Sequence, residues 1–377
     1  MIKKKIIVAV ITARPSYSRI KTVLLSLRDN PKVDLRIILG SSAILDRFGN
    51  VSDIIEKDGL KISHKIYNSI EGSNIITMPK TTAHAIVELS FLFNEIKPDA
   101  VITIADRYET LATSIAASYM NITLVHIQGG ELSGSIDDKV RNSSTVLADI
   151  HFTSCEDAKK RVLTLGANPK YTFNLGCPSI DIARNVREKK TNINKIAKKY
   201  GGVGDDIDLE NEYIVVMQHP VTTEYMEASD QIIQTLESII EVNMKCIWFW
   251  PNIDAGSDII SKTIRQYREK NLVPNIHFYK NMEPEDFLSV LDNCSVLVGN
   301  SSVGVREGAY LSVPTVDIGS RQTGRGKSSN IIEVDFVKEE IVSAIHMQIQ
   351  KKKIAPDFIY GDGQSGKRIA DKLYSIL

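Results

Sequence analysis

Three carboxylates in the first half of the chain lie where they could exchange protons with a ligand. Asp106 follows the apolar run Ala100–Ile104, and Glu131 and Asp137 lie in a loop that holds three glycines within six residues. A carboxylate beyond a buried strand is a good general acid or base, and glycines let a ligand approach the backbone closely. Two such groups can divide acid and base work if their environments separate their pKa values.

The same carboxylates also have a purely structural interpretation. Asp106 could cap the helix that is predicted to start directly after it. Asp137 and Asp138 could favour a helix N-terminus, with Arg141 as an ion-pair partner one turn later. The residues by themselves leave both interpretations open.

Cationic residues at other predicted strand ends could bind a phosphate. Arg14 follows the first apolar run and could grip a phosphate with two hydrogen bonds, supported by Ser18, or it could pair with a carboxylate. His219 follows a later run, and Pro220 restricts the loop beside it. This histidine could donate to a phosphate oxygen or be an ordinary hydrogen-bonded polar residue.

The string Val298–Glu307 is the richest of the phosphate candidates. Ser301 and Ser302 offer adjustable hydroxyl donors, and the predicted helix Val303–Leu311 would present a positive N-terminus to an anion. Glu307 suits a neutral polar part of the same ligand, such as a ribose diol. Taken alone, the string is more readily a capped strand-to-helix turn.

Two further loops follow apolar runs in the same manner. One holds Asn252, and the other, Gly319–Ser328, places three cations in a glycine-rich segment. The second loop resembles a P-loop, but Arg321 occupies the position of the required first glycine, so we exclude an ATPase. The spacing of potential ligands predicts no metal site, and we expect no cofactor.

All these candidates are positioned by an alternation of β-rich apolar runs and amphipathic helices. The alternation predicts an α/β fold with two doubly wound, Rossmann-like domains, an interdomain cleft, and ligands at the carboxyl ends of the parallel strands. A polar stretch from Arg184 to Glu212 predicts the hinge, so we expect domains at 1–182 and 183–364, with a last helix at 365–377 joining the first domain. The predicted strands are Ile6–Ile11, Leu35–Leu39, Ala100–Ile104, Thr123–Ile127 and Ile150–Phe152, then Tyr213–Met217, Lys245–Trp250, Ile276–Tyr279, Ser295–Val298 and Thr315–Ile318.

Composition agrees with a two-domain protein that binds a small molecule. A chain of 377 residues exceeds the usual size of one core, and 46 basic against 46 acidic residues argue against nucleic acid or a membrane surface as the partner. Thr12–Pro15 interrupts the N-terminal apolar run, which therefore predicts the first strand of a cytoplasmic protein. The four scattered cysteines predict neither disulfides nor structural zinc.

The candidate residues fall into strings that can be compared with known families: Gly130–Asp138, Gln218–Glu224, Pro251–Ser257, Gly299–Ser302, Arg306–Glu307 and Gly319–Gln322. Together they resemble the hydrolysing UDP-N-acetylglucosamine 2-epimerases, the bacterial sialic-acid pathway enzymes and the epimerase half of the bifunctional animal enzyme. The resemblance runs from Arg14 to the turn at Tyr360–Gly363, nearly the whole chain.

The resemblance implies a fold like that of B-type glycosyltransferases, a UDP-sugar substrate, no cofactor, and a homodimer or homotetramer. In the family, trans elimination of UDP between C1 and C2 gives a 2-acetamidoglucal, and water then adds to give N-acetylmannosamine. Asp106 and Asp137 match the family's catalytic aspartates. Carried over, the UDP ligands are Ser301 and Ser302 for the diphosphate, His219 and Arg321 for the phosphates, Glu307 for the ribose, and Asn252 in the same pocket.

Three positions depart from the sialic-acid members. Those often carry His-Gly-Asp at Ile104–Asp106, a catalytic Glu at Gln128, and Arg-His at Arg141–Asn142. A glutamine can bind a substrate but cannot exchange a proton as a carboxylate does. Either Glu131 takes that role, or the chemistry is shared differently, or the substrate is a related 2,4-diacetamido or GDP-linked sugar. The competing hypotheses are a non-hydrolysing epimerase, a sugar transferase and an inactive nucleotide-sugar sensor.

Overall fold

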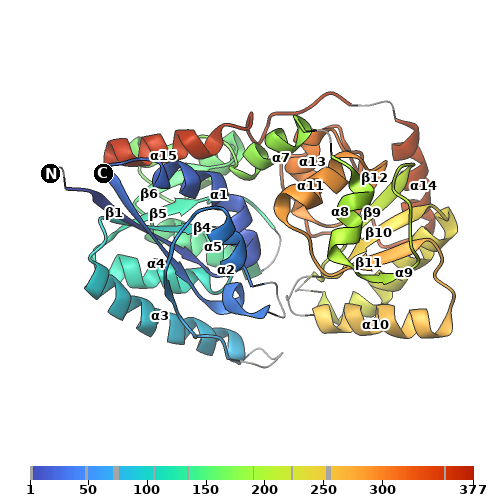
Figure 1. Cartoon of the computed structure of the whole chain (residues 1–377), viewed down its shortest axis with the longest axis horizontal. Coiled ribbons are helices and arrows are strands. Elements are labelled where there is room, and N and C mark those ends of the chain that lie inside the picture. The colour runs from blue at the N-terminus through green and yellow to red at the C-terminus, as the bar shows by residue number, and fades with distance from the viewer. Residues whose placement is uncertain are drawn as a thin grey trace. The chain divides into compact units, whose positions relative to one another are not determined.

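The computed structural model describes residues 3–46, 50–70, 76–104, 107–133, 136–189, 191–221, 224–251, 256–351 and 354–377. The chain divides into two compact units, each built around its own seven-stranded sheet (Figure 1). The first unit comprises Met1–Glu131, Asp137–Asp181 and Tyr360–Leu377, and the second comprises Leu132–Ile136 and Ile182–Ile359.

The sheet of the first unit is parallel throughout its described pairs, in the order β3-β2-β1-β4-β5-β6-β7. The chain runs outward from β1 to β3 and then returns to β4 on the other side of β1. Ligands of open α/β sheets bind at such a reversal, beyond the carboxyl ends of the strands. The strands are β1 Lys5–Ile11, β2 Val33–Leu39, β3 Ile62–Lys65, β4 Ala100–Ile104, β5 Thr123–Ile127, β6 Ile150–Thr153 and β7 Thr172–Asn174.

Helices cover both faces of this sheet because its central strands are apolar on both sides. Ile7 and Ile11 of β1 belong to one buried cluster, and Val8 and Val10 belong to another, as the alternation of side chains along a strand requires. From the N-terminus to the start of the second unit, the helices are α1 Arg14–Arg28, η1 Ser41–Ile44, α2 Ser52–Lys57, α3 Thr77–Ile96, α4 Thr110–Tyr119, α5 Ile136–Leu147, α6 Glu156–Thr164, η3 Pro169–Tyr171 and α7 Ser179–Arg187.

The final helix, α15 (Ser365–Ile376), belongs to the first unit and packs against α1. The buried carboxylate of Asp181 accepts the backbone N–H groups of Ser365 and Gly366 at 2.8 and 2.7 Å, which satisfies the start of the helix. Leu373 lies in the same buried cluster as the strands of the sheet. The C-terminal segment is therefore part of the first core.

The second unit repeats the architecture, in the order β14-β13-β12-β9-β10-β11-β8, with only β8 antiparallel among its described pairs. Its strands are β8 Val203–Gly204, β9 Tyr213–Met217, β10 Lys245–Phe249, β11 Ile276–Tyr279, β12 Val296–Gly299, β13 Thr315–Ile318 and β14 Ile331–Val334. Its helices are α8 Ile193–Tyr200, η4 Tyr225–Glu227, α9 Ala228–Val242, α10 Ser257–Lys270, α11 Pro284–Asp292, α12 Ser302–Val305, α13 Glu307–Leu311 and α14 Lys338–Gln350.

The predicted fold class, two doubly wound α/β domains, is confirmed, but one predicted helix is wrong in detail. The segment expected as a single helix over Val303–Leu311 is interrupted at Arg306, whose φ of −97° and ψ of −75° depart from ideal helical values although they stay in the right-handed region, and forms α12 and α13. None of the helices in the described part of the chain combines the length and the apolarity needed to cross a membrane.

Candidate active site

The loop after β5 is held in place by close backbone packing on α6. At Gly130, which has a φ of +76°, a Cβ atom would lie 2.2 Å from the main-chain oxygen of Ala158, so only glycine fits. The next residue, Glu131, is 4% exposed and accepts a hydrogen bond from the Ser154 hydroxyl at 2.6 Å. Its main-chain oxygen accepts another from Arg141 at 2.6 Å. Glu131 is thus fixed at both its side chain and its backbone.

The two aspartates at the start of α5 are placed differently from Glu131. Asp137 lies half-buried in the first turn of the helix. Asp138 forms an ion pair with Arg141, which is 1% exposed and also holds the Glu131 carbonyl. Asp138 therefore has a structural task at the start of α5.

Gln128, where the resembling family carries a glutamate, adopts a left-handed φ of +66° and is 2% exposed. Its side-chain amide donates to the Cys177 sulfur at 3.0 Å, and its Oε1 has no hydrogen-bond partner among the described residues. A non-glycine residue in this conformation stores strain, and such strain gathers at functional sites.

Arg14 and Ser18 lie together beyond the end of β1, in the first turns of α1. The Ser18 hydroxyl donates to the main-chain oxygen of Arg14 at 3.3 Å, so the two residues share one side of the helix. Both are half-buried. Asp106 and Asn252, the other predicted residues at strand ends, lie outside the described residues.

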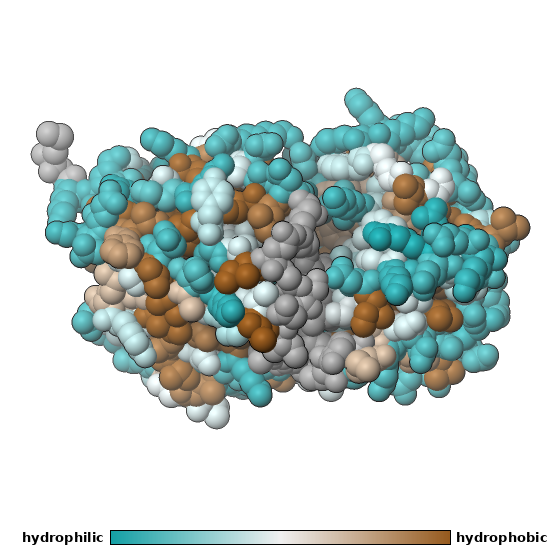
Figure 2. All heavy atoms as spheres, turned by 90° about the horizontal axis from the view of Figure 1, so that it is seen from below, coloured by the Kyte–Doolittle hydropathy of each residue, from teal (hydrophilic) through white to brown (hydrophobic). Residues whose placement is uncertain are grey.

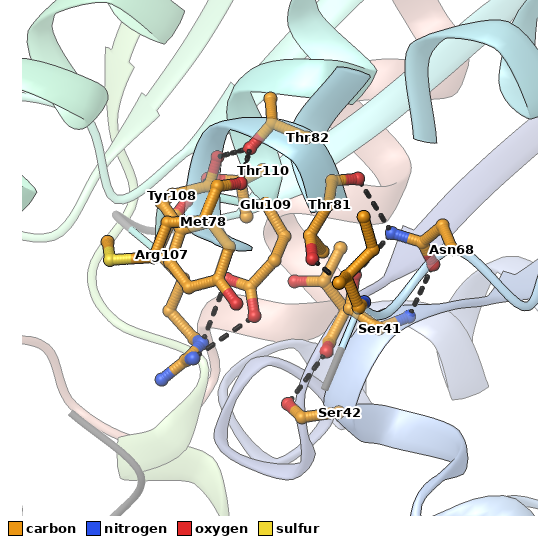
Figure 3. Close-up of polar contacts among 12 residues, drawn as sticks. Ser41, Ser42, Asn68, Met78, Thr81, Thr82, Arg107, Tyr108, Glu109 and Thr110 are labelled. Atoms are coloured by element: carbon orange, nitrogen blue, oxygen red, sulfur yellow. Dashed lines mark hydrogen bonds and ion pairs between the residues drawn. The ribbon is translucent and has the colours of Figure 1, made fainter. Parts of the chain in front are cut away.

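An ion pair that sequence reasoning missed lies a few residues after β4 (Figure 3). Glu109 is 1% exposed, and its two carboxylate oxygens accept from Nε and Nη2 of Arg107 at 3.2 and 3.1 Å. This two-point contact fixes the guanidinium one residue after the predicted catalytic aspartate. The string Asp-Arg-Tyr-Glu after an apolar run was the signal that could have found it.

Asn68 and Ser41 join the ends of β2 and β3 in the same region (Figure 3). Asn68 accepts the backbone N–H of Ser41 at 2.8 Å and donates to the Ser41 hydroxyl at 2.8 Å. The neighbouring Ser42 hydroxyl donates to the main-chain oxygen of Thr12, beyond β1, at 3.1 Å. The carboxyl ends of three adjacent strands are therefore cross-linked by short polar side chains.

In the second unit the structure brings His219, Ser301 and Arg321 to three adjacent strand ends, those of β9, β12 and β13. The backbone N–H of His219 donates to the side chain of Asn300 at 2.8 Å, and Arg321 donates to the main-chain oxygen of Asn300 at 3.1 Å. These predicted phosphate ligands thus lie together at the carboxyl ends of neighbouring strands. Asn300, which was not among the predicted site residues, links His219 to Arg321.

The two serine hydroxyls are oriented by internal bonds that leave each its own proton to donate. The Ser301 oxygen accepts the backbone N–H of Val303 at 3.4 Å, and the Ser302 oxygen accepts from Arg306 at 3.1 Å. A hydroxyl that accepts one bond can still donate another, as a phosphate requires. Because α12 has only four residues, these donors matter more here than a helix dipole.

Glu307 and Lys327 are held by partners within the second unit. Glu307 is 6% exposed, and its Oε2 lies 3.7 Å from Nε of Arg306. Lys327, one of the three cations of the glycine-rich loop, lies 2.8 Å from Asp317. Burial raises the pKa of the Asp317 carboxyl, and Lys327 opposes that rise. Lys327 therefore stabilises the conformation of its own loop by pairing with Asp317.

Groups of three or more histidine, cysteine, aspartate or glutamate side chains placed to hold a metal ion do not occur among the residues that the structure describes. The arrangement offers two chemically distinct sets of groups. The first unit supplies carboxylates and an arginine–glutamate pair, and the second supplies hydroxyl, imidazole and guanidinium donors.

Comparison with known proteins gives a consistent result. A family model described as UDP-N-acetylglucosamine 2-epimerase matches residues 25–374. The UDP-N,N'-diacetylbacillosamine 2-epimerase (hydrolyzing) of Legionella pneumophila is 29% identical, over 100% of this chain and 97% of that protein. The polysialic acid biosynthesis protein P7 of Escherichia coli is 30% identical, over 93% of this chain and 88% of that protein.

A solved structure has a similar fold. The UDP-GlcNAc 2-epimerase from Neisseria meningitidis bound to UDP-GlcNAc matches with a TM-score of 0.82 at 17% identity, covering 98% of this chain and 100% of that chain.

Proposed function

We infer that this chain, which belongs to the UDP-N-acetylglucosamine 2-epimerase family, is a hydrolysing 2-epimerase that converts UDP-N-acetylglucosamine and water to N-acetylmannosamine and UDP. The observation that carries the hydrolysing outcome is the Legionella relative, which is named as hydrolyzing and aligns with the whole chain. Such an activity fits a cytoplasmic enzyme of sialic-acid or related nonulosonic-acid biosynthesis, with no nucleic-acid or membrane partner.

The first step of the proposed reaction is elimination. A base removes the proton at C2, the electron pair forms the C1=C2 bond, and the bond from C1 to the UDP oxygen breaks, which yields a 2-acetamidoglucal and UDP. The C2 proton is weakly acidic, so its removal needs a positioned base, and a carboxylate suits that role. We assign this chemistry to Asp106 and Asp137, with Gln128 binding the sugar. Arg107, the next residue in the sequence after Asp106, is oriented by Glu109.

The second step adds water across the double bond. Hydroxide goes to C1 and a proton goes to C2 from the face opposite to the one that lost it, so the product has the manno configuration. In the preceding elimination, UDP departs with additional negative charge, which preorganised donors stabilise. Arg321, His219, Ser301 and Ser302 are the donors at the edge of the second sheet, while Glu307 suits the ribose.

A second candidate substrate is a UDP-linked 2,4-diacetamido sugar. The Legionella relative is named for UDP-N,N'-diacetylbacillosamine, and its similarity extends over the full length of this chain. The chemistry at C1 and C2 is the same for both sugars, so only the surroundings of C4 and C6 would differ.

The test is incubation of the purified protein with UDP-N-acetylglucosamine, UDP-N,N'-diacetylbacillosamine and their GDP-linked counterparts, without added metal or nicotinamide. We expect release of free UDP, a 2-epimerised sugar by NMR, and deuterium at C2 when the reaction is run in heavy water. A UDP-linked epimer would instead identify a non-hydrolysing enzyme. Release of UDP with the gluco configuration retained would exclude epimerisation, and tight binding without turnover would identify a sensor.

A further inference from the structure

We propose that Asn300 is a positioning residue that preorganises the diphosphate half of the UDP site. It sets the geometry of three loops before the ligand arrives, so that the affinity added by the diphosphate, beyond that of uridine, depends on it. The proposal rests on the proposed binding of UDP by the second unit.

The side chain of Asn300 pairs with both main-chain groups of one residue in the loop after β9. Its Oδ1 accepts the N–H of His219 at 2.8 Å, and its Nδ2 donates to the carbonyl of the same His219 at 2.8 Å. Asn300 is 0% exposed. Among side chains of this length only an amide offers an acceptor and a donor in one plane, so neither aspartate nor alanine can make this pair of bonds at neutral pH.

The backbone of Asn300 fixes the loop after β13. Its carbonyl accepts from the guanidinium of Arg321 at 3.1 Å and from the side-chain amide of Gln322 at 2.8 Å. Its N–H donates to the Met217 carbonyl at the end of β9, at 3.2 Å. One buried residue after β12 therefore determines where His219 and Arg321 lie relative to Ser301.

Preorganisation of this kind changes affinity selectively. Donors that are already aimed at a phosphate need no ordering when it binds, whereas loosened loops lose that advantage. The uridine base and ribose would contact other groups, so their share of the affinity should be preserved. Substitution of a residue that only stabilised the fold would lower the affinity for uridine and the affinity added by the diphosphate together, or would lower neither.

The experiment measures the dissociation constants of uridine and of UDP by calorimetry for the wild-type chain, Asn300→Ala and Asn300→Asp. The readout is the ratio of the uridine constant to the UDP constant. We expect this ratio to fall at least about tenfold in both variants, as expected for loss of well-made buried hydrogen bonds. The alanine variant shows that the fall does not require an added negative charge.

A pH profile supplies a second readout. A protonated carboxyl can donate to the His219 carbonyl while its other oxygen accepts the N–H, as the native amide does. Burial raises the pKa of a carboxyl, so protonation should occur in an accessible range. UDP affinity of Asn300→Asp should therefore recover toward acid pH relative to wild type, and Asn300→Ala should show no such recovery.

The matched control is Gln348→Glu, which also converts a buried amide to a carboxyl. Gln348 is 0% exposed and donates to the carbonyls of Thr315 and Asn330, at the opposite end of β13 from the Arg321 loop. It should leave the ratio unchanged. If the Asn300 variants fail to fold, Gln322→Met removes one bond to the Asn300 carbonyl and should give a smaller fall.

This inference is overturned if the wild-type chain binds UDP and the folded Asn300 variants have the same ratio of uridine to UDP dissociation constants as the wild type. The proposed function would still stand in that case. Equal losses for uridine and UDP would reduce Asn300 to a structural residue. A wild-type chain that neither binds UDP nor releases it from any sugar would overturn both.

Discussion

Single residues in the carboxylate loop differ in how far they are buried. Glu131 is 4% exposed and accepts a 2.6 Å hydrogen bond from Ser154, whereas Asp137 is half-buried at the start of α5. A half-buried carboxylate is more accessible to a ligand than one that is almost fully buried and already accepts a short hydrogen bond. We therefore expect Asp137, rather than Glu131, to exchange a proton with the ligand.

Exchange of Asp137 for asparagine should abolish proton transfer while preserving shape. We expect Asp137→Asn to slow UDP release by at least roughly a hundredfold, the usual contribution of a general acid or base, and Asp106→Asn to do the same. Glu131→Gln can still accept from Ser154 and should retain most of the activity. Steady-state UDP release decides this: full activity in Asp137→Asn removes that residue from the mechanism, and a comparable loss in Glu131→Gln makes Glu131 catalytic.

Gly299 is a second residue whose substitution has a predictable effect, in this case on stability. Its φ is +133°, and a Cβ atom would lie 2.3 Å from the Met217 carbonyl of the adjacent strand. Gly299→Ala should destabilise the second unit by at least about 2 kcal/mol, because strain and a backbone clash act together. Urea unfolding measures this, with Gly166→Ala as control, since nothing lies within 4 Å of a Cβ there. Equal losses in both variants would show that the unusual φ alone is responsible.

The four strands that sequence reasoning missed share a position in their sheets. β3 and β7 are the edges of the first sheet, and β14 and β8 are the edges of the second. Their residues are mostly half-buried or exposed, whereas the central strands are buried along most of their length. An apolar run predicts a strand buried on both faces, but an edge strand is selected by pairing with its neighbour, which the sequence does not display.

β6 should make the stability of the first unit pH-dependent. Burial lowers the pKa of His151 from 6.5 to about 4, and nearby Asp149 only partly opposes this. The unfolded histidine therefore binds a proton at a higher pH than the folded one, so its contribution is complete above pH 6.5 and is lost as the pH falls toward 4. The loss amounts to roughly 3 kcal/mol at most.

Urea unfolding at a series of pH values between neutrality and acid tests this. His151→Gln should flatten the dependence in that range, because it removes the group that titrates. His346→Gln, which changes an exposed histidine of α14, should leave the slope as it is in the wild type. An unaltered slope in His151→Gln would assign the acid sensitivity to other groups.

For the whole molecule, the expected homo-oligomer needs a surface, and α3 offers one. Val87 and Phe91 are 55% and 72% exposed and lie four residues apart, on one side of the helix. Figure 2, which views the side where α3 lies in Figure 1, shows apolar side chains on this part of the first unit. Apolar groups gathered on one face commonly mark an interface between proteins.

Light scattering after gel filtration should therefore show a homodimer or homotetramer for the wild type and a smaller species for Phe91→Glu. Leu272→Glu is the matched control, since Leu272 is 93% exposed in the second unit. A monomeric wild type would contradict the homo-oligomer, and dissociation by Leu272→Glu alone would move the interface to the second unit.

Local patterns in the sequence were enough to predict the fold class and the family. The alternation of apolar runs and amphipathic helices predicted the two doubly wound units, and the strings at the strand ends predicted the family that the comparison then showed. Both follow from short-range rules, because a strand buried on two faces must be apolar and the turn after it is where a ligand can be reached.

Which side chains act together depends on contacts between distant parts of the chain, and these became visible in the folded structure. It showed that Asn300 ties His219 to Arg321, that Glu109 orients Arg107, and that the helix expected after Ser302 breaks at Arg306. The two partners of Asn300 lie 81 and 21 residues away in the chain. No local rule encodes such a contact, because it arises only when parallel strands far apart in sequence become neighbours in the sheet.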